Sequence, residues 1–72
     1  SKYREEIMYL LFLSKYEMAV NSIDDKKLER YNAAKEEYYY FADEYPNSKY
    51  VNDIKKRYDE INAFLDNYKF DE

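Results

Sequence analysis

The chain has 72 residues, a net charge of −4, eleven tyrosines and a single proline, and it contains no glycine, cysteine or histidine. The lack of cysteine and histidine excludes disulfides, thiolate zinc sites and imidazole acid–base catalysis. Because tight β-hairpins depend on glycine, in pairs such as Asn-Gly, the sequence predicts an all-α fold. The acidic balance argues against nucleic-acid binding, and no apolar run reaches the length of about 18 residues that a membrane-spanning helix needs.

The first predicted helix spans residues 2–21, and its centre is apolar on every side, a pattern typical of a helix buried on more than one face. The face expected to meet the second helix carries Tyr9, Phe12, Leu13, Tyr16 and Val20. The other face has no obvious partner in the chain and carries Ile7, Leu10, Leu11, Ser14 and Met18.

We expect the apolar residues of that second face to be exposed and to stack on a neighbour, and these residues are Ile7, Leu10, Leu11 and Met18. The neighbour would be an upstream part of a longer parent chain or another copy, which makes self-association through the first helix an expectation. The start at Ser1 rather than Met indicates an excised fragment.

The second predicted helix spans residues 24–45 and stops before Pro46, which lacks an N–H and disfavours helix at the preceding residue. Its N-cap is expected to be Ser22 or Asp24, and Ser22 with Asp25 resembles a capping box. Steps of three and four place one apolar stripe on this helix, comprising Tyr31, Ala34, Tyr38, Phe41, Ala42 and Tyr45.

The third predicted helix spans residues 49–68, with Asn47 or Ser48 as its expected cap. Its stripe is the cleanest in the chain and comprises Val51, Ile54, Tyr58, Ile61, Leu65 and Tyr68. Three helices joined by two short turns predict antiparallel neighbours in one small domain.

The acidic residues do not form a recognisable catalytic or metal-binding pattern. Many of the carboxylates are adjacent pairs, as in Glu36 and Glu37, and adjacent side chains on a helix point about 100° apart. The chain also lacks a Glu-x-x-His motif, a Ca²⁺-binding loop and a glycine-rich phosphate loop. We therefore predict no catalytic residue, no cofactor, no metal ligand and no enzyme activity.

Two groups of residues are candidates for binding a protein partner. Lys55, Lys56 and Arg57 form the one basic cluster, which is either a solvated helix face or a docking patch for an acidic protein surface or anionic lipid. Tyr39 and Tyr40 fall off the apolar stripe of the second helix, so they either pack against another helix or are exposed anchors for a partner.

The spacing of the second helix resembles a tetratricopeptide repeat. Ala34, Tyr38 and Phe41 lie twelve, eight and five residues before Pro46, where that repeat has a small residue, an aromatic residue and a second small residue. Phe41 departs from the pattern, so the next helix is expected to pack more loosely or in a new orientation. The part of the chain that spans the first two predicted helices is about nine residues longer than the repeat of about 34 residues. This excess predicts longer helices or a longer turn.

The motif Phe41-x-x-x-Tyr45-Pro46-x-Ser48-x-Tyr50 resembles the C-terminal repeats of BamD-type outer-membrane-assembly lipoproteins. The resemblance implies a scaffold at the periplasmic face of the outer membrane, anchored through an upstream lipidated cysteine. It also implies protein partners, namely the periplasmic domains of the β-barrel insertase and accessory lipoproteins. The alternative is a tetratricopeptide adaptor of another cell-envelope pathway.

Overall fold

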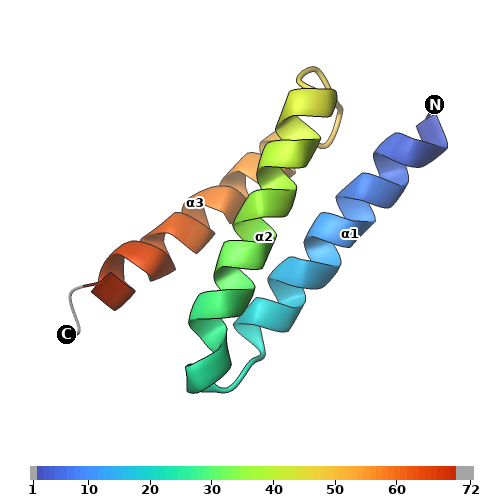
Figure 1. Ribbon diagram of the computed structural model, residues 1–72. Helices are drawn as coiled ribbons and strands as arrows, with labels where there is room; N and C mark the ends of the chain where they lie inside the picture. Colours follow the sequence, from blue (N-terminus) through green and yellow to red (C-terminus); the bar gives the residue numbers. More distant parts are fainter. Residues whose placement is uncertain (1, 70–72) are drawn as a thin grey trace.

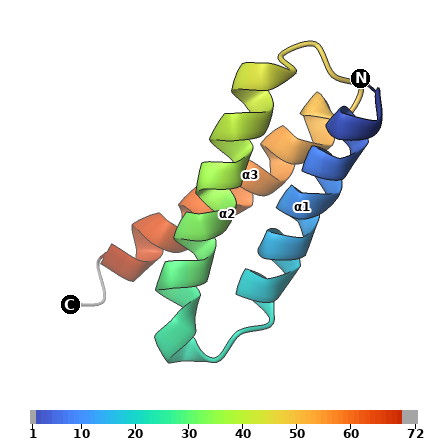
Figure 2. The same ribbon diagram turned by 45° about the vertical axis from the view of Figure 1, so that its right-hand side comes forward.

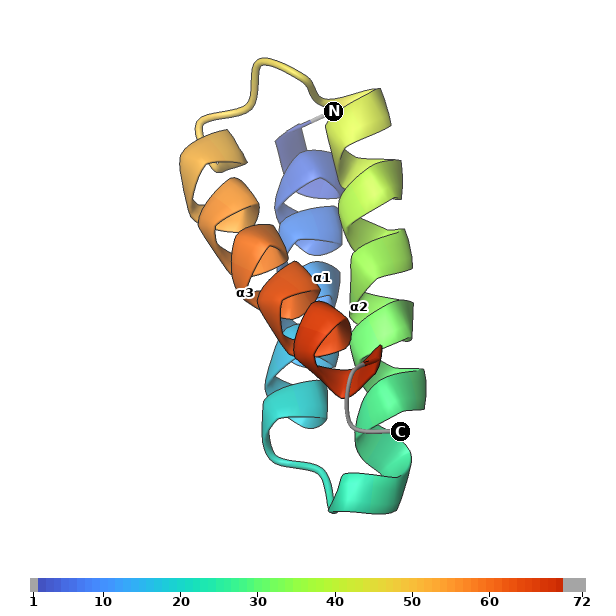
Figure 3. The ribbon, with the colours of Figure 1, turned by 90° about the vertical axis from the view of Figure 1, so that its left-hand side faces the viewer.

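The computed structural model describes residues 2–69, and this part of the chain forms three α-helices and no strand (Figure 1). α1 spans Lys2–Val20, α2 spans Asp24–Glu44 and α3 spans Val51–Lys69. The predicted all-α fold class is therefore confirmed. α1 and α2 pack as an antiparallel hairpin, and α3 reverses direction again and crosses this hairpin obliquely (Figures 2 and 3).

α3 runs in the same direction as α1. Four side-chain hydrogen bonds join α1 to α3 and to the turn before it, and each joins residues that are 43 or 44 positions apart. A constant offset of this kind requires two helices that run in the same direction and in register. On its other side α3 lies against α2, where the stacked rings of Tyr38 and Tyr58 have centroids 3.9 Å apart.

The core is a single cluster where the three helices meet. Its members are all buried, and they are Phe12, Tyr16, Ala19, Tyr31, Ala34, Phe41, Ile54, Ile61 and Leu65. Phe41 has no exposed surface, so the large ring that replaces the expected small residue is enclosed in the core.

The inward face of α1 differs from the prediction at its C-terminal end. Val20 is 39% exposed, whereas Ala19 is fully buried. Phe12, Tyr16 and Ala19 follow one another at steps of four and three, so they share one face of the helix. Val20 lies about 100° further around and, although predicted on the face that meets the second helix, it is not among the buried residues of α1.

The helix ends differ from the predicted ones by one or two residues. α1 ends at Val20 instead of residue 21, α2 ends at Glu44 instead of residue 45, and α3 ends one residue later than predicted. α3 begins at Val51 instead of residue 49, because Ser48 holds the preceding residues in a turn. The Ser48 hydroxyl accepts the backbone N–H of Tyr50 at 3.0 Å, and its carbonyl accepts the N–H of Val51 at 3.1 Å.

The N-terminus of α2 has no side-chain cap. Ile23 occupies the N-cap position without a side-chain hydrogen bond, so the predicted caps Ser22 and Asp24, and the capping box with Asp25, are wrong. Ser22 is engaged elsewhere, because its hydroxyl donates to a carbonyl in the last turn of α1 and accepts from Arg30 at 2.8 Å. Ser22 therefore caps the C-terminal end of α1 and not the N-terminus of α2.

Shortening a buried side chain of the core should lower the free energy of unfolding by an amount that depends on how much of the side chain is removed. Phe41→Ala removes a fully buried ring, which costs about 3–5 kcal/mol and is most of the stability of a small domain, so we expect this variant to be largely unfolded. Ile61→Val should lose about 1 kcal/mol and remain folded. Urea denaturation followed by circular dichroism measures both losses.

The control for this test is Tyr40→Ala, because Tyr40 lies next to Phe41 in the sequence but is 60% exposed. We expect it to change the free energy of unfolding by no more than about 0.5 kcal/mol. Similar losses for Tyr40→Ala and Phe41→Ala would contradict this description of the core.

Candidate protein-binding surfaces

One side of α1 faces away from both other helices and is apolar. Its large side chains are half exposed or nearly so: Ile7 at 63%, Leu10 at 54%, Leu11 at 44% and Met18 at 51%. They lie opposite the buried Phe12 and Tyr16. These are the four residues of the predicted stacking face, hereafter the α1 outer face, and their role in stacking remains a prediction. Contiguous exposed apolar surface of this kind is typical of protein interaction sites.

The five candidate partner-binding residues on α2 and α3 do not form one surface. Tyr39 lies at the seam between these helices, where its hydroxyl is 3.2 Å from that of Tyr58 and its ring meets the Tyr58 ring edge-on. Lys55 precedes Tyr58 by one turn of α3 and so lies toward the same seam. Tyr39 is thus part of the packing between α2 and α3, although 49% of its surface remains exposed.

Arg57 lies on the opposite side of α3, toward α1. Its Nε donates to Asp53 at 3.1 Å, and its guanidinium carbon is 5.2 Å from the centre of the Tyr16 ring. The same carboxylate of Asp53 accepts the hydroxyl of Tyr9 at 2.7 Å. Arg57 therefore contributes to the contact between α1 and α3 rather than to a free basic patch.

The remaining candidates are Lys56 and Tyr40, which point outward from α3 and α2. Lys56 lies between Lys55 and Arg57 in the sequence, so it projects between the two sides of α3 that those residues occupy. Lys55 pairs with Asp59 at 2.9 Å, and this exposed pair contributes little to stability. Among residues 2–69, no ion pair engages Lys56, and Tyr40 is 60% exposed.

Two tyrosine–carboxylate hydrogen bonds join α1 to α3, namely Tyr16 to Glu60 and Tyr9 to Asp53. The hydrogen bond from Tyr16 to Glu60, reinforced by burial, raises the pKa of Tyr16 to about 12. The hydrogen bonds from Tyr9 and then from Arg57 lower the pKa of Asp53. The sequence carried no signal for these pairs, because each joins residues 44 positions apart.

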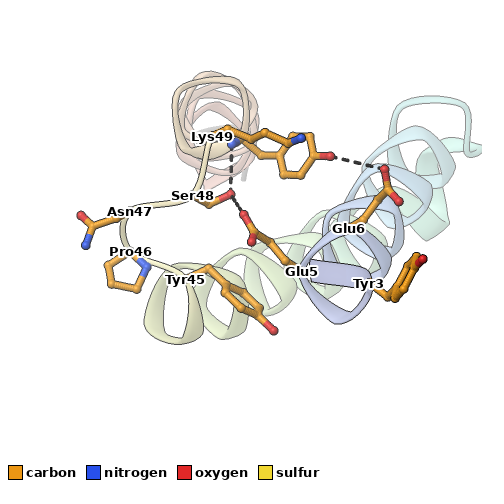
Figure 4. Close-up of a pocket in the computed structure, with 9 residues that line it drawn as sticks. Tyr3, Glu5, Glu6, Tyr45, Pro46, Asn47, Ser48 and Lys49 are labelled. Carbon is orange, nitrogen blue, oxygen red and sulfur yellow. Dashed lines mark hydrogen bonds between the residues drawn. The ribbon is translucent and has the colours of Figure 1, made fainter. Parts of the chain in front are cut away.

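A hollow of about 710 Å³ opens between the start of α1 and the turn before α3 (Figure 4). Glu5 accepts the hydroxyl of Ser48, and Glu6 accepts that of Tyr50 at 3.5 Å. The ammonium of Lys49 lies 5.3 Å from the centre of the Tyr50 ring. These groups hold the turn against α1, so we assign the hollow to the junction of the fold and not to a ligand site.

Residues 2–69 contain no group of three or more carboxylate, imidazole or thiolate side chains placed to hold a metal ion. No helix in the described part of the chain is long and apolar enough to cross a membrane. Comparison with protein-family models, with curated proteins and with solved structures gives no match.

The raised pKa of Tyr16 predicts a loss of stability in alkaline solution. The unfolded chain releases this proton near pH 10 and the folded chain near pH 12, so the stability that Tyr16 contributes is fully present below about pH 10 and is lost as the pH rises to about 12. Over this range, we expect the free energy of unfolding of Tyr16→Phe to fall by about 2 kcal/mol less than that of the wild type.

Urea denaturation at a series of alkaline pH values measures this difference. Tyr40→Phe is the matched control, because it also removes one phenol but from an exposed position, and its pH dependence should follow the wild type. If the free energy of unfolding depended equally on pH in Tyr16→Phe and Tyr40→Phe, the hydrogen bond between Tyr16 and Glu60 would not be what keeps the Tyr16 hydroxyl protonated.

Proposed function

We propose that the chain is a non-catalytic scaffold that binds other proteins through the outward sides of its helices. One observation carries the proposal: large side chains stay exposed on α1 and α2 although the core beneath them is closed. These side chains are Ile7, Leu10, Leu11 and Met18 on α1 and Tyr40 on α2. Aromatic and large aliphatic residues of this kind are typical anchors of protein interfaces.

The arrangement of the helices supports a tetratricopeptide-like repeat as the form of the scaffold. α3 restarts in the direction of α1 after 43 or 44 residues, which matches a repeat of about 34 residues lengthened by about nine. The added residues lie in the helices, since α1 and α2 contain 19 and 21 residues and only residues 21–23 separate them. On this proposal, longer helices and not a longer turn supply the excess.

The resemblance around Pro46 supports a more specific proposal, a fragment of a lipoprotein of the outer-membrane β-barrel assembly machinery. Its place would be the periplasmic face of the outer membrane. Its partners would be the periplasmic domains of the insertase and accessory lipoproteins. The second candidate is a tetratricopeptide adaptor of another cell-envelope pathway, which the same helix arrangement also supports.

Binding of the purified periplasmic domains of the insertase to the immobilised chain tests the specific proposal. We expect the wild type to bind, and Tyr40→Ala and Lys56→Glu each to weaken binding about tenfold, because both side chains point outward from the helices. Asn32→Ala, at an exposed position on α2, is the control and should bind as the wild type does.

The outcomes separate the two candidates. No binding by the wild type would overturn the assignment to the insertase and favour the adaptor of another pathway. Wild-type binding that neither Tyr40→Ala nor Lys56→Glu weakens would show that these outward side chains are not the anchors.

A further inference from the structure

We propose that the α1 outer face binds the same face of a second copy of this chain, with the two α1 helices side by side and parallel. The proposal rests on the proposed function only in that this face binds protein, and it names the occupant. It also sets the relative orientation of the two copies, which follows from the charges at the edges of the face.

The apolar side chains of the face suit a symmetric contact. Because a helix advances about 100° per residue, Ile7, Ser14 and Met18 lie along the midline of the face, and Leu10 and Leu11 lie on either side of it. A two-fold axis parallel to α1 sets Leu10 of each copy opposite Leu11 of the other. Ser14 of one copy then faces Ser14 of the other across the axis, and this small side chain lets the helices approach closely.

The edge of the face next to α2 is basic. Arg4 pairs with Glu44 of α2 at 3.2 Å, and Lys15 pairs with Glu37 of α2 at 2.8 Å. The side chains of Arg4 and Lys15 remain 59% and 37% exposed. A guanidinium has five N–H donors and an ammonium three, so a cation that holds one carboxylate can also receive a second.

The edge of the face next to α3 is acidic. Glu6 marks this edge, since it accepts the hydroxyl of Tyr50 in the turn before α3. Glu17 follows eleven residues later, which is about three turns of helix, so it lies on the same edge. Both glutamates are exposed.

These edges favour a parallel pair over an antiparallel one. A two-fold axis along α1 sets the basic edge of one copy against the acidic edge of the other. Arg4 of one copy then lies opposite Glu6 of the other, and Lys15 lies opposite Glu17. In each pair the two residues differ by two positions, which is about 3 Å along the helix axis. An antiparallel pair instead sets Glu6 and Glu17 against the same acidic edge of the second copy, which is repulsive.

Sedimentation equilibrium of the full chain tests the contact. We expect the wild type to form dimers as its concentration rises, and Leu11→Glu to weaken dimerisation at least about tenfold. Asn32→Glu, which adds the same charge at an exposed position on α2, is the control and should dimerise as the wild type does. A wild type that remains a monomer at all concentrations would overturn the proposal, whereas the insertase-binding test would be unaffected.

Two further variants test the orientation. Because the chain contains no cysteine, Met18→Cys provides one thiol per copy, and only the parallel pair brings the two thiols together to form a disulfide on oxidation. Asn52→Cys, exposed on α3, is the matched control and should cross-link poorly. Dimers in which Met18→Cys cross-links no better than Asn52→Cys would overturn the parallel arrangement.

Glu17→Lys tests the charged edges, because it sets two positive charges together in the parallel pair and relieves repulsion in an antiparallel one. We expect it to weaken dimerisation several-fold, and the effect to shrink in high salt. Glu36→Lys, on the exposed side of α2, makes the same charge change and should have little effect. Stronger dimerisation of Glu17→Lys would overturn the parallel arrangement.

Discussion

Burial of Phe12, Phe41, Ile54 and Ile61 where the three helices meet holds α3 across the hairpin of α1 and α2. The burial of each such side chain stabilises the fold by about 1.5–3 kcal/mol, and a chain of 72 residues can bury only a few of them. Each helix supplies one stripe to this core. α1 carries a second apolar stripe, and no side of the core remains to receive it. The exposed face of α1 is thus a consequence of how a small chain closes its core.

The tyrosines explain how so small a core is sealed at its edges. A tyrosine ring packs on apolar neighbours while its hydroxyl reaches a polar group. Tyr9 and Tyr16 do this between α1 and α3, where their hydroxyls meet Asp53 and Glu60. Carboxylates that look like ordinary surface charge in the sequence are therefore part of the helix contact.

Periodicity was sufficient to predict the three helices, because an apolar stripe at steps of three and four depends only on local geometry. It also indicated the second face of α1, since Ile7 and Leu11 lie a full turn apart on the side away from Phe12. The absence of glycine did not prevent short turns, as no described residue has a positive φ.

The contacts that individual side chains make could not be predicted, because they depend on how the helices approach one another. Arg57 belongs to the cluster that is predicted to be either a solvated helix face or a docking patch, yet its guanidinium lies over the ring of Tyr16 on another helix. Ser22 is one of the two predicted N-caps of α2, yet Arg30 and the end of α1 engage its hydroxyl. In each case a residue had two plausible partners, and only the packed structure decides between them.

The constant offset between α1 and α3 also bears on the order in which the chain folds. Residues 21–23 join α1 to α2 over a short loop, whereas each bond between α1 and α3 closes a loop of about 44 residues. α2 and α3 are likewise joined by the short segment 45–50. The entropy cost of closing a loop rises with its length, so the contacts between α1 and α3 should form only after α2 has packed against one of these helices. By the same reasoning, the contacts between α1 and α3 should open before those that either helix makes with α2.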